Sequence, residues 1–478
     1  LPMSRLIKSL LAVPAKPAAL KAVHQPFDGK LLAEIESTGS DGVEQALATA
    51  YGLFRDRRAW LPLHQRISIL EKTASLMNAQ AESLAMSAAQ EGGKPLADSR
   101  VEVTRAIDSI RLCVECLRAD NSAAVPMNIN AASADRQSFT LTEPIGVVVA
   151  VSAFNHPLNL IAHQVGPAVA AGCPVIVKPS EATPLSCFRF VEILREAGLP
   201  APWCQALVTS DREVSTRLVT DARVGFFSFI GSAKVGWMLR SQLAPGVRCA
   251  LEHGGAAPAI VAADADLDSA IPSLLKGAFY HAGQVCVSVQ RIFVHHSIAR
   301  QLAERLAEGA QALKTGDPTL EETDVGPLIR PAEVERVASW VSAAIAEGAE
   351  LLSGGQALSE RLYAPTVLYE PAADSKVSTE EIFGPVVCLY PYEHIDDAIA
   401  RANALPWAFQ AAVFTRDLQT ALHASKQLDA SAVMINDHTA FRVDWMPFAG
   451  LRQSGLGTGG IPYTLHDMQV RKLVVMPL

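Results

Sequence analysis

Three residues in this chain carry side chains suited to acyl chemistry. Cys286 follows Gly283 in HAGQVCVSVQ; the glycine lets the backbone approach a ligand closely, and a thiolate is a strong nucleophile. Glu252 stands before two glycines in LEHGGAAPAIV, an apolar setting in which a carboxyl holds its proton more tightly and serves as a general base. Asn155, in AFNHPLN, has an amide that can donate to an oxyanion. Together they predict a nucleophile, a base and an oxyanion donor.

Each of these residues also fits an ordinary structural role. A free cysteine is usually a small buried apolar residue, and a lone glutamate is usually solvated. Asn155 stands between a strand and a helical stretch, where asparagine is a good helix N-cap. The C-x-x-C pair Cys113 and Cys116 lies in a helical stretch without a second pair or a histidine cluster, so we expect no metal there.

A candidate phosphate site lies in FIGSAKVG, where Gly231 ends an apolar run and Gly236 lies inside a helix start. The N-terminus of a helix binds anions through free backbone N–H groups. The spacing is neither G-x-G-x-x-G nor a P-loop, so the motif predicts a phosphate contact without specifying the ligand.

Short apolar stretches alternate with long stretches of helical period, an order that places these residues in an α/β protein with parallel sheets. The strand candidates are 145–151, 173–178 and 291–296, and the helix candidates are 42–61, 298–314 and 332–351. Residues 147–180 read as one strand–helix–strand unit. Two stretches stand apart, 137–143 and 469–478; lone strands of this kind often join sheets between subunits, so we expect a homo-oligomer.

Composition limits the class of protein further. The chain has 478 residues, 49% of them hydrophobic, and a formal net charge of −8. This predicts two or three folded domains and disfavours disorder and general nucleic-acid binding. Eight irregularly spaced cysteines favour reduced thiols in a cytoplasm. No apolar run reaches the roughly 18 residues that a membrane span needs, so we expect no membrane partner.

Eight segments in series give the chain a family resemblance. They are EGGKPLADS (91–99), FNHPLN (154–159), AAGCPVIVKPSEATPLS (170–186), FIGSAKVG (229–236), LEHGG (251–255), GQVC (283–286), EEIFGPVV (380–387) and PFAGLRQSGLG (447–457). In order and spacing the chain resembles the aldehyde dehydrogenase superfamily, whose members oxidise aldehydes with NAD(P). The branch it looks most like contains lactaldehyde and phosphonoacetaldehyde dehydrogenases.

The resemblance implies a fold and a domain order. It implies a Rossmann-like NAD-binding domain (1–127 and 144–253) and an α/β catalytic domain (254–440). Residues 128–143 and 441–478 would form a small oligomerisation sheet and a C-terminal substrate-tunnel segment. Family members are usually dimers or tetramers, so a homodimer or homotetramer is implied.

The resemblance also implies a role for each matched residue. Cys286 matches the nucleophile that forms a thioester, Glu252 the base and Asn155 the oxyanion donor. The matched cofactor positions are Lys178 and Glu181 at the adenosine ribose, Gly231, Ser232 and Gly236 at the pyrophosphate site, and Glu381 and Phe383 at the nicotinamide side. We expect NAD, with NADP as the alternative, because the Glu181 carboxylate can accept from ribose hydroxyls and repel a 2′-phosphate, although Lys178 would offset that repulsion.

Departures from the family pattern concern the substrate. Ala153-Phe154, His253, Val285 and Ala449 replace more common residues, and none removes a catalytic group. The sequence suggests a short aldehyde with an anionic or strongly polar group, held by Arg105, His156 and Arg442, since arginine bonds two oxygens at once. Each of these residues also has a plain alternative: a surface ion pair, a helix-start residue and a solvated loop residue.

Other functions stay open from the sequence. Phe448, with Phe154 and Trp445, could instead line an apolar pocket for a neutral aromatic or aliphatic aldehyde. A CoA-acylating dehydrogenase is the main rival reaction, and Glu252 argues against it because that branch tends to lack the base. A non-catalytic family member and a cysteine hydrolase are further rivals; neither explains the nucleophile, base and cofactor motifs together.

Overall fold

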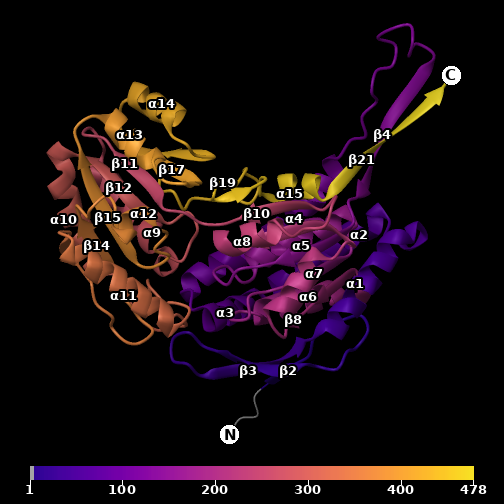
Figure 1. The fold of residues 1–478 in the computed structure, drawn as a ribbon, viewed down its shortest axis with the longest axis horizontal. Helices are drawn as coiled ribbons and strands as arrows, with labels where there is room; N and C mark the ends of the chain where they lie inside the picture. Colours follow the sequence, from indigo (N-terminus) through magenta and orange to yellow (C-terminus); the bar gives the residue numbers. More distant parts are fainter. Residues whose placement is uncertain (1–4) are drawn as a thin grey trace.

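The computed structural model describes residues 5–478, so residues 1–4 of the expected NAD-binding domain lie outside the described residues. The chain forms two lobes, each built on a mostly parallel sheet, and a two-stranded arm that projects from one of them (Figure 1). This confirms the predicted α/β class. In residues 5–478 no helix is both long enough and apolar enough to cross a membrane.

The sheet of the first lobe has the strand order β20-β10-β9-β5-β6-β7, parallel except for β20. Its strands are β5 (Val147–Val151), β6 (Val175–Lys178), β7 (Cys204–Ala206), β9 (Val224–Ile230), β10 (Arg248–Glu252) and β20 (Gly455–Leu456). Its helices are α1 (Ser40–Arg55), α2 (Leu63–Ala79), α3 (Ala81–Gly92), α4 (Leu96–Ala119), α5 (Asn159–Ala171), α6 (Leu185–Glu196), α7 (Arg212–Thr220), α8 (Ala233–Arg240) and α15 (Ile461–Asp467). A small sheet of β1 (Arg5–Ile7), β2 (Ala19–His24), β3 (Leu31–Thr38) and β8 (Val208–Thr209) borders this lobe.

The sheet of the second lobe has the order β13-β14-β15-β12-β11-β17-β18, with β13 antiparallel. Its strands are β11 (Ala257–Val261), β12 (Val289–His295), β13 (Glu350–Ser353), β14 (Thr366–Tyr369), β15 (Val386–Tyr392), β17 (Gln410–Phe414) and β18 (Ala432–Ile435). Its helices are α9 (Leu267–Phe279), α10 (His296–Ala312), α11 (Pro331–Ala346), α12 (Lys376–Thr379), α13 (Ile395–Asn403) and α14 (Leu418–Gln427). Parallel strands buried on both faces explain the near-continuous apolar runs that the sequence shows at these positions.

All three predicted helices end before their periodic stretches do, α10 by two residues and the other two by more. The stretch 42–61 gives α1 only to Arg55, because Asp56 accepts from the backbone N–H of Arg58 and starts a separate 3₁₀ turn. The stretch 332–351 gives α11 only to Ala346, because Gly348, with a φ of 111°, turns the chain toward β13. The three predicted strands are present, within two residues of the expected bounds.

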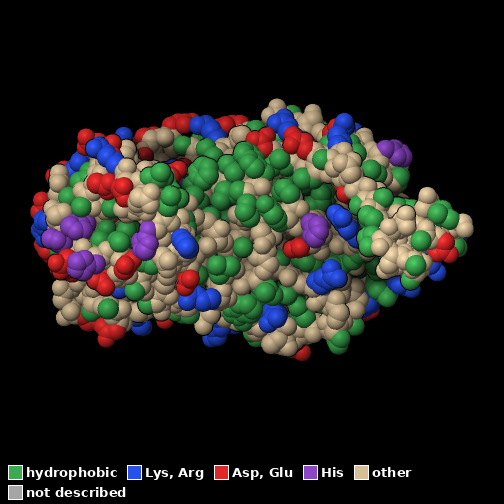
Figure 2. Space-filling view, turned by 90° about the horizontal axis from the view of Figure 1, so that it is seen from above, with side chains coloured by type: hydrophobic (Ala, Val, Ile, Leu, Met, Phe, Trp, Pro, Cys, Tyr) green, Lys and Arg blue, Asp and Glu red, His purple; other side chains and the backbone are tan. Residues whose placement is uncertain are grey.

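The two stretches set apart in the sequence pair with each other. β4 (Arg136–Pro144) and β21 (Gln469–Pro477) form an antiparallel ribbon in register over nine residue pairs. The ribbon is the arm that extends away from the first lobe, with the C-terminus at its tip (Figure 1). Seen from above, it forms one end of the molecule, and hydrophobic side chains gather in the middle of the same face (Figure 2).

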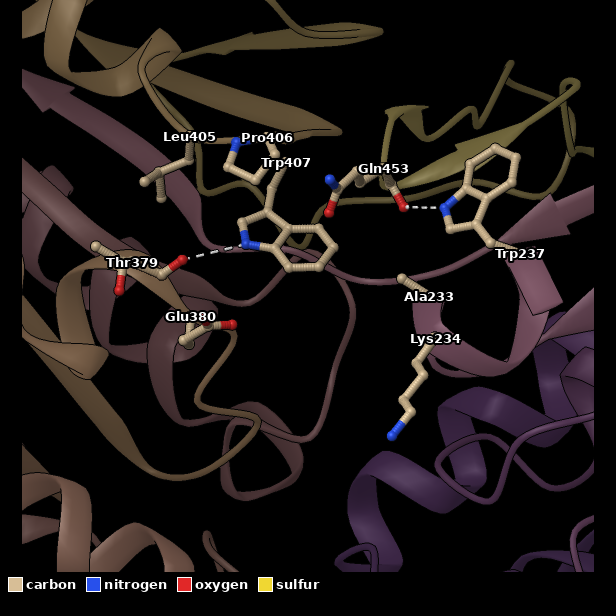
Figure 3. A pocket seen from close by; sticks show the side chains of 9 residues that line it. All are labelled: Ala233, Lys234, Trp237, Thr379, Glu380, Leu405, Pro406, Trp407 and Gln453. Carbon is tan, nitrogen blue, oxygen red and sulfur yellow. Dashed lines mark hydrogen bonds between the residues drawn. The ribbon is translucent and has the colours of Figure 1, made fainter.

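The segment before the arm connects the two lobes. β19 (Leu451–Arg452) pairs with β16 (Trp407–Ala408) beside the second lobe, and β20 then pairs with β10 in the first. Two indoles anchor the same junction: Trp237 donates to the backbone oxygen of Gln453, and Trp407 to that of Thr379 (Figure 3). The groove between these indoles contains none of the predicted site residues.

Candidate active site

A cavity of about 710 Å³ lies at the carboxyl ends of β5, β6, β9 and β10, where it faces loops of the second lobe. In open parallel sheets, ligands bind at this edge, where the strand order reverses. The cavity brings together every site residue predicted from the sequence except one. They are Arg105, Asn155, His156, Lys178, Glu181, Gly231, Ser232, Glu252, Cys286, Glu381, Phe383, Arg442 and Phe448.

The exception is Gly236, which lies in α8. A Cβ at this position would collide with the Nε2 end of the His253 ring. Glycine at this position therefore allows close packing of α8 against the loop after β10. The His253 ring itself is buried: Nδ1 donates to the backbone oxygen of Gln453, and Nε2 has no partner among the described residues.

Cys286 lies in the loop between α9 and β12, and the backbone before it is unusual. His281 and Ala282 have φ values of 49° and 55°, and Gly283 follows with 71°. Residues with side chains rarely adopt this region, at a cost of roughly 1–3 kcal/mol each, and such strain gathers at functional sites. A Cβ on Gly283 would run into the backbone oxygen of Gly384, so only glycine lets this loop approach the next one.

The Asn155 side chain is fixed against the cysteine loop. Its Nδ2 donates to the backbone oxygen of Gln284 over 3.0 Å, which leaves its second amide hydrogen free. The helix-cap interpretation of Asn155 is wrong, because α5 begins at Asn159 and its cap position, Leu158, has no side-chain hydrogen bond.

Burial changes the acid–base properties of the thiol and the carboxyl. It raises the pKa of Cys286 well above its usual value, and the nearby Glu252 carboxyl adds to the effect. Burial also raises the pKa of Glu252, against the opposing charge of Arg442, whose Nη1 lies 3.9 Å from the glutamate Oε1. The thiol is therefore protonated at neutral pH, and the carboxyl is a stronger base than an exposed one.

Arg442 is a cavity residue and not a solvated loop residue. Its side chain is 11% exposed, and its guanidinium carbon lies 3.7 Å from the centre of the Phe448 ring. A guanidinium over an aromatic face is held by the charge distribution of the ring. Among the described residues its carboxyl neighbour is Glu252, and its Nε has no hydrogen-bond partner.

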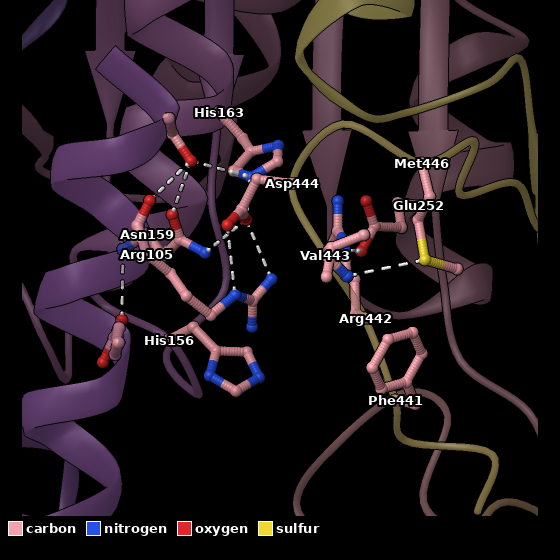
Figure 4. Close-up of polar contacts among 12 residues, drawn as sticks. Arg105, His156, Asn159, His163, Glu252, Phe441, Arg442, Val443, Asp444 and Met446 are labelled. Carbon is pink, nitrogen blue, oxygen red and sulfur yellow. Dashed lines mark hydrogen bonds and ion pairs between the residues drawn. The ribbon is translucent and has the colours of Figure 1, made fainter. Parts of the chain in front are cut away.

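Arg105 reaches the same cavity from α4 through a partner that the sequence did not reveal. Asp444, 3% exposed, accepts from Arg105 at 2.9 Å, from Asn159 at 3.2 Å and from His163 at 2.8 Å (Figure 4). Burial lowers the pKa of His163 to about 4, so it is a neutral donor. The Arg105 bonds use Nε and Nη2, which leaves Nη1 without a partner among the described residues.

The other side of the cavity fits a dinucleotide. Lys178 lines it at the end of β6, and its Nζ has no hydrogen-bond partner in residues 5–478. Ser232 caps α8 without using its side chain, so the first N–H groups of the helix stay open for an anion. Glu181 is half exposed and ion-paired with Lys21 at 2.9 Å. An unpaired cation, an open helix N-terminus and a carboxylate at separate points of one cleft suit pyrophosphate and ribose groups.

Two further residues, Glu381 and Phe383, line the cavity where the resemblance expects the nicotinamide. Glu381 accepts from the backbone N–H of Gly255, and burial raises its pKa to about 7. Phe383 has a φ of 50°, and its ring meets Phe154 edge to face, with centroids 5.9 Å apart. Fold and cavity together define a class, an α/β enzyme with a cleft suited to a dinucleotide beside a buried cysteine.

Residues 13–474 match the model of the aldehyde dehydrogenase family. The 3-sulfolactaldehyde dehydrogenase of Priestia megaterium is 38% identical over 447 residues, which are 93% of this chain and 92% of the relative. The lactaldehyde dehydrogenase of Methanocaldococcus jannaschii is 35% identical over 458 residues, 95% and 96% of the two chains.

Solved structures agree along almost the whole chain. Aldehyde dehydrogenase 21 of Physcomitrella patens, in complex with the reaction product succinate, has a TM-score of 0.94, 33% identity and 99% coverage of both chains. The glyceraldehyde-3-phosphate dehydrogenase of M. jannaschii, complexed with NADP, has a TM-score of 0.92 and 34% identity, covering 96% of this chain and all of that one. An NAD-dependent aldehyde dehydrogenase of Sinorhizobium meliloti has a TM-score of 0.94 and 32% identity, covering 100% and 95%.

The chain therefore belongs to the aldehyde dehydrogenase family. It is an NAD(P)-dependent oxidoreductase, which confirms the resemblance drawn from the eight motifs.

Proposed function

We propose that this enzyme oxidises a short anionic aldehyde to a carboxylic acid through a thioester on Cys286. The observation that carries the reaction is the meeting of Cys286, Glu252 and the amide of Asn155 in one cavity, although β5, β10 and the α9–β12 loop supply them separately. A nucleophile, a base and an oxyanion donor serve separate steps of an acyl transfer.

The proposed steps follow from these positions. Cys286 passes its thiol proton to solvent water, and the thiolate attacks the aldehyde carbon, while Asn155 and the backbone N–H of Cys286 hold the oxyanion. A nicotinamide held on the Glu381 and Phe383 side of the cavity would supply the hydride acceptor that conversion of this adduct into a thioester requires. Glu252 then takes a proton from water, and the resulting hydroxide displaces the cysteine sulfur and releases the acid. The buried Glu252 supports release by water over transfer to CoA.

The proposed substrate class rests on the cations at the substrate end of the cavity. Arg442 and Arg105 both line it, and Nε of Arg442 and Nη1 of Arg105 have no hydrogen-bond partner among the described residues. An anionic group would complete their hydrogen bonding. The relative named for 3-sulfolactaldehyde and the structure that contains succinate concern anionic compounds. The neutral aromatic alternative has less support, since Arg442 covers the Phe448 ring and Trp445, 57% exposed, does not line the cavity.

Removing either arginine should weaken turnover of charged aldehydes, and the loss should be selective for Arg105, because Arg442 also lies beside Glu252. For Arg105→Ala and Arg442→Ala we expect kcat/KM for succinic semialdehyde to fall by about 10- to 100-fold, the effect of losing a charge-assisted hydrogen bond. The values for propanal should change far less in Arg105→Ala. Arg100→Ala is a matched control on the same helix, because Arg100 bonds the surface residues Glu82 and Glu321. Equal losses for charged and neutral aldehydes in Arg105→Ala, or a wild-type preference for benzaldehyde, would rule out an anion site.

The cofactor preference depends on Glu181. We propose NAD over NADP, because this carboxylate can accept from ribose hydroxyls and repel a 2′-phosphate, although Lys21 and Lys178 weaken the repulsion. Glu181→Ser should raise kcat/KM for NADP relative to NAD by roughly tenfold, the scale of one lost charge interaction near a surface. Steady-state rates with each cofactor give the ratio of kcat/KM for NAD to kcat/KM for NADP. A ratio near one in the wild type would contradict the proposal.

We also propose that the arm joins copies of this chain. Residues 123–125 cover part of the β4 edge of the ribbon. The exposed edge of a ribbon is readily extended by the sheet of a neighbouring chain. Its large hydrophobic side chains are exposed: Phe139, Leu141, Leu473, Val475 and Met476. Such exposure supports a homodimer or homotetramer over a monomer.

A further inference from the structure

A buried lysine controls one side chain of the cavity. Lys94, between α3 and α4, is completely buried. Its Nζ lies 2.7 Å from the Glu102 carboxyl and 2.8 Å from Nδ1 of His156. Burial lowers the pKa of Lys94, and the negative charge of Glu102 opposes that effect and favours the ammonium form. Glu102 is itself fixed, because its other oxygen accepts from the backbone N–H groups of Leu158 and Asn159.

The contact with Lys94 determines where the His156 proton sits. An ammonium group has three donors and no acceptor, so Nδ1 must be the acceptor and cannot carry a proton. The neutral ring then carries its proton on Nε2. A doubly protonated ring would place an N–H against the ammonium; accordingly, burial and the Lys94 charge hold the pKa of His156 well below its usual value. His156 is thus a neutral donor through Nε2.

The remaining nitrogen of His156 belongs to the cavity. The residue lines the cavity and directly follows Asn155, and Nε2 has no hydrogen-bond partner among the described residues. Tyr280 fixes the plane of the ring by stacking, with centroids 6.0 Å apart and an interplanar angle of 24°. A donor fixed in tautomer and in plane, one residue from the oxyanion amide, suits an uncharged oxygen next to the reacting carbonyl.

We propose that Nε2–H of His156 donates to a hydroxyl on the carbon next to the aldehyde carbon, so that the site prefers 2-hydroxyaldehydes, with Lys94 as the positioning residue that sets the tautomer. The inference rests on the proposed function and adds to it. The arginines are suited to a distal anion, whereas a neutral donor is suited to a hydroxyl. Lactaldehyde and 3-sulfolactaldehyde, for which two relatives are named, both carry that hydroxyl.

The kinetic test compares lactaldehyde with propanal, which differ in this hydroxyl and carry no charge. His156→Phe keeps an aromatic ring without the donor, and we expect the ratio of the two kcat/KM values to fall roughly tenfold. His156→Gln restores an N–H donor and should recover most of the ratio. Lys94→Met should lower the ratio as His156→Phe does. An unchanged ratio in His156→Phe would overturn the proposal.

The tautomer is measured directly in the wild-type enzyme, so the result does not depend on whether Lys94→Met folds. With histidine labelled by ¹⁵N, and the His156 signal assigned by its loss in His156→Gln, we expect an unprotonated Nδ1 and a protonated Nε2. A proton on Nδ1 would overturn the role of Lys94. If the proposed anion site is wrong, the ratio of kcat/KM for lactaldehyde to that for propanal is unaffected, because neither aldehyde is charged. If the proposed dehydrogenase mechanism is wrong, neither aldehyde is turned over.

Discussion

We expect Cys286→Ala to abolish aldehyde oxidation and to leave cofactor binding nearly intact, which is the largest effect that the proposed mechanism predicts. Without the sulfur, no adduct forms from which a hydride can leave, and removal of a nucleophile that works as part of a unit costs roughly 10³-fold or more in kcat. The change removes a single sulfur from a loop whose shape depends on backbone contacts, so the Lys178 side of the cavity stays as it is.

Two measurements separate chemistry from binding in this variant. Steady-state formation of the reduced cofactor reports kcat, and fluorescence titration with NADH reports binding. Cys249→Ala is the matched control, because Cys249 is also partly buried but does not line the cavity. If Cys286→Ala retained more than a few per cent of kcat, the covalent mechanism would be wrong.

Glu252→Gln should separate the two halves of the reaction. Hydride transfer precedes hydrolysis, so the variant should release roughly one NADH per active site in a burst and then stall as the thioester accumulates. We expect the steady-state rate to fall about 10²- to 10⁴-fold, the contribution of a general base. Rapid-mixing absorbance measures the burst, and mass spectrometry identifies the acylated cysteine.

The pH profile gives an independent check on the same residue. Burial raises the pKa of Glu252, so a larger fraction of its carboxyl is protonated, and inactive as a base, as the pH falls toward that raised value. The wild-type steady-state rate should therefore fall on the acid side, and Glu252→Gln should lack that limb. Glu360→Gln, at an exposed carboxyl remote from the cavity, is the control. Absence of the burst together with slow acylation would move Glu252 to the first half of the reaction.

Sequence reasoning located the elements and the site residues that carry local signals. Glycines, strand ends and helical periods are visible within a few consecutive residues. The sequence alone therefore predicts which elements hold the motifs around Cys286 and Glu252. Helix ends were harder: α1 stops at Arg55 because of one capping contact at Asp56, which hydrophobic periodicity does not register.

Partners from distant parts of the chain could not be predicted. Asp444 and Arg105 are 339 residues apart, and Lys94 and His156 are 62 apart, so neither pairing leaves a periodic or motif signal. The sequence holds only weak signals of these two pairings. Asp444 is an acidic residue two positions after Arg442, and Lys94 lies in the motif EGGKPLADS, but composition does not show that Lys94 is buried. A buried charge becomes informative only when its neighbours are known.

The C-terminal segment has a consequence for biosynthesis. The sheet of the second lobe uses strands from residues 257–435 alone, so a nascent chain can close it as soon as that stretch has left the ribosome. The first lobe differs: β20 forms the edge of its sheet, and Ile461, Leu465 and Met468 belong to its apolar core. Domains usually fold in the order of synthesis. Here the lobe that is translated first is completed last, so a ribosome must finish nearly the entire message before any copy of the enzyme can assemble its cavity.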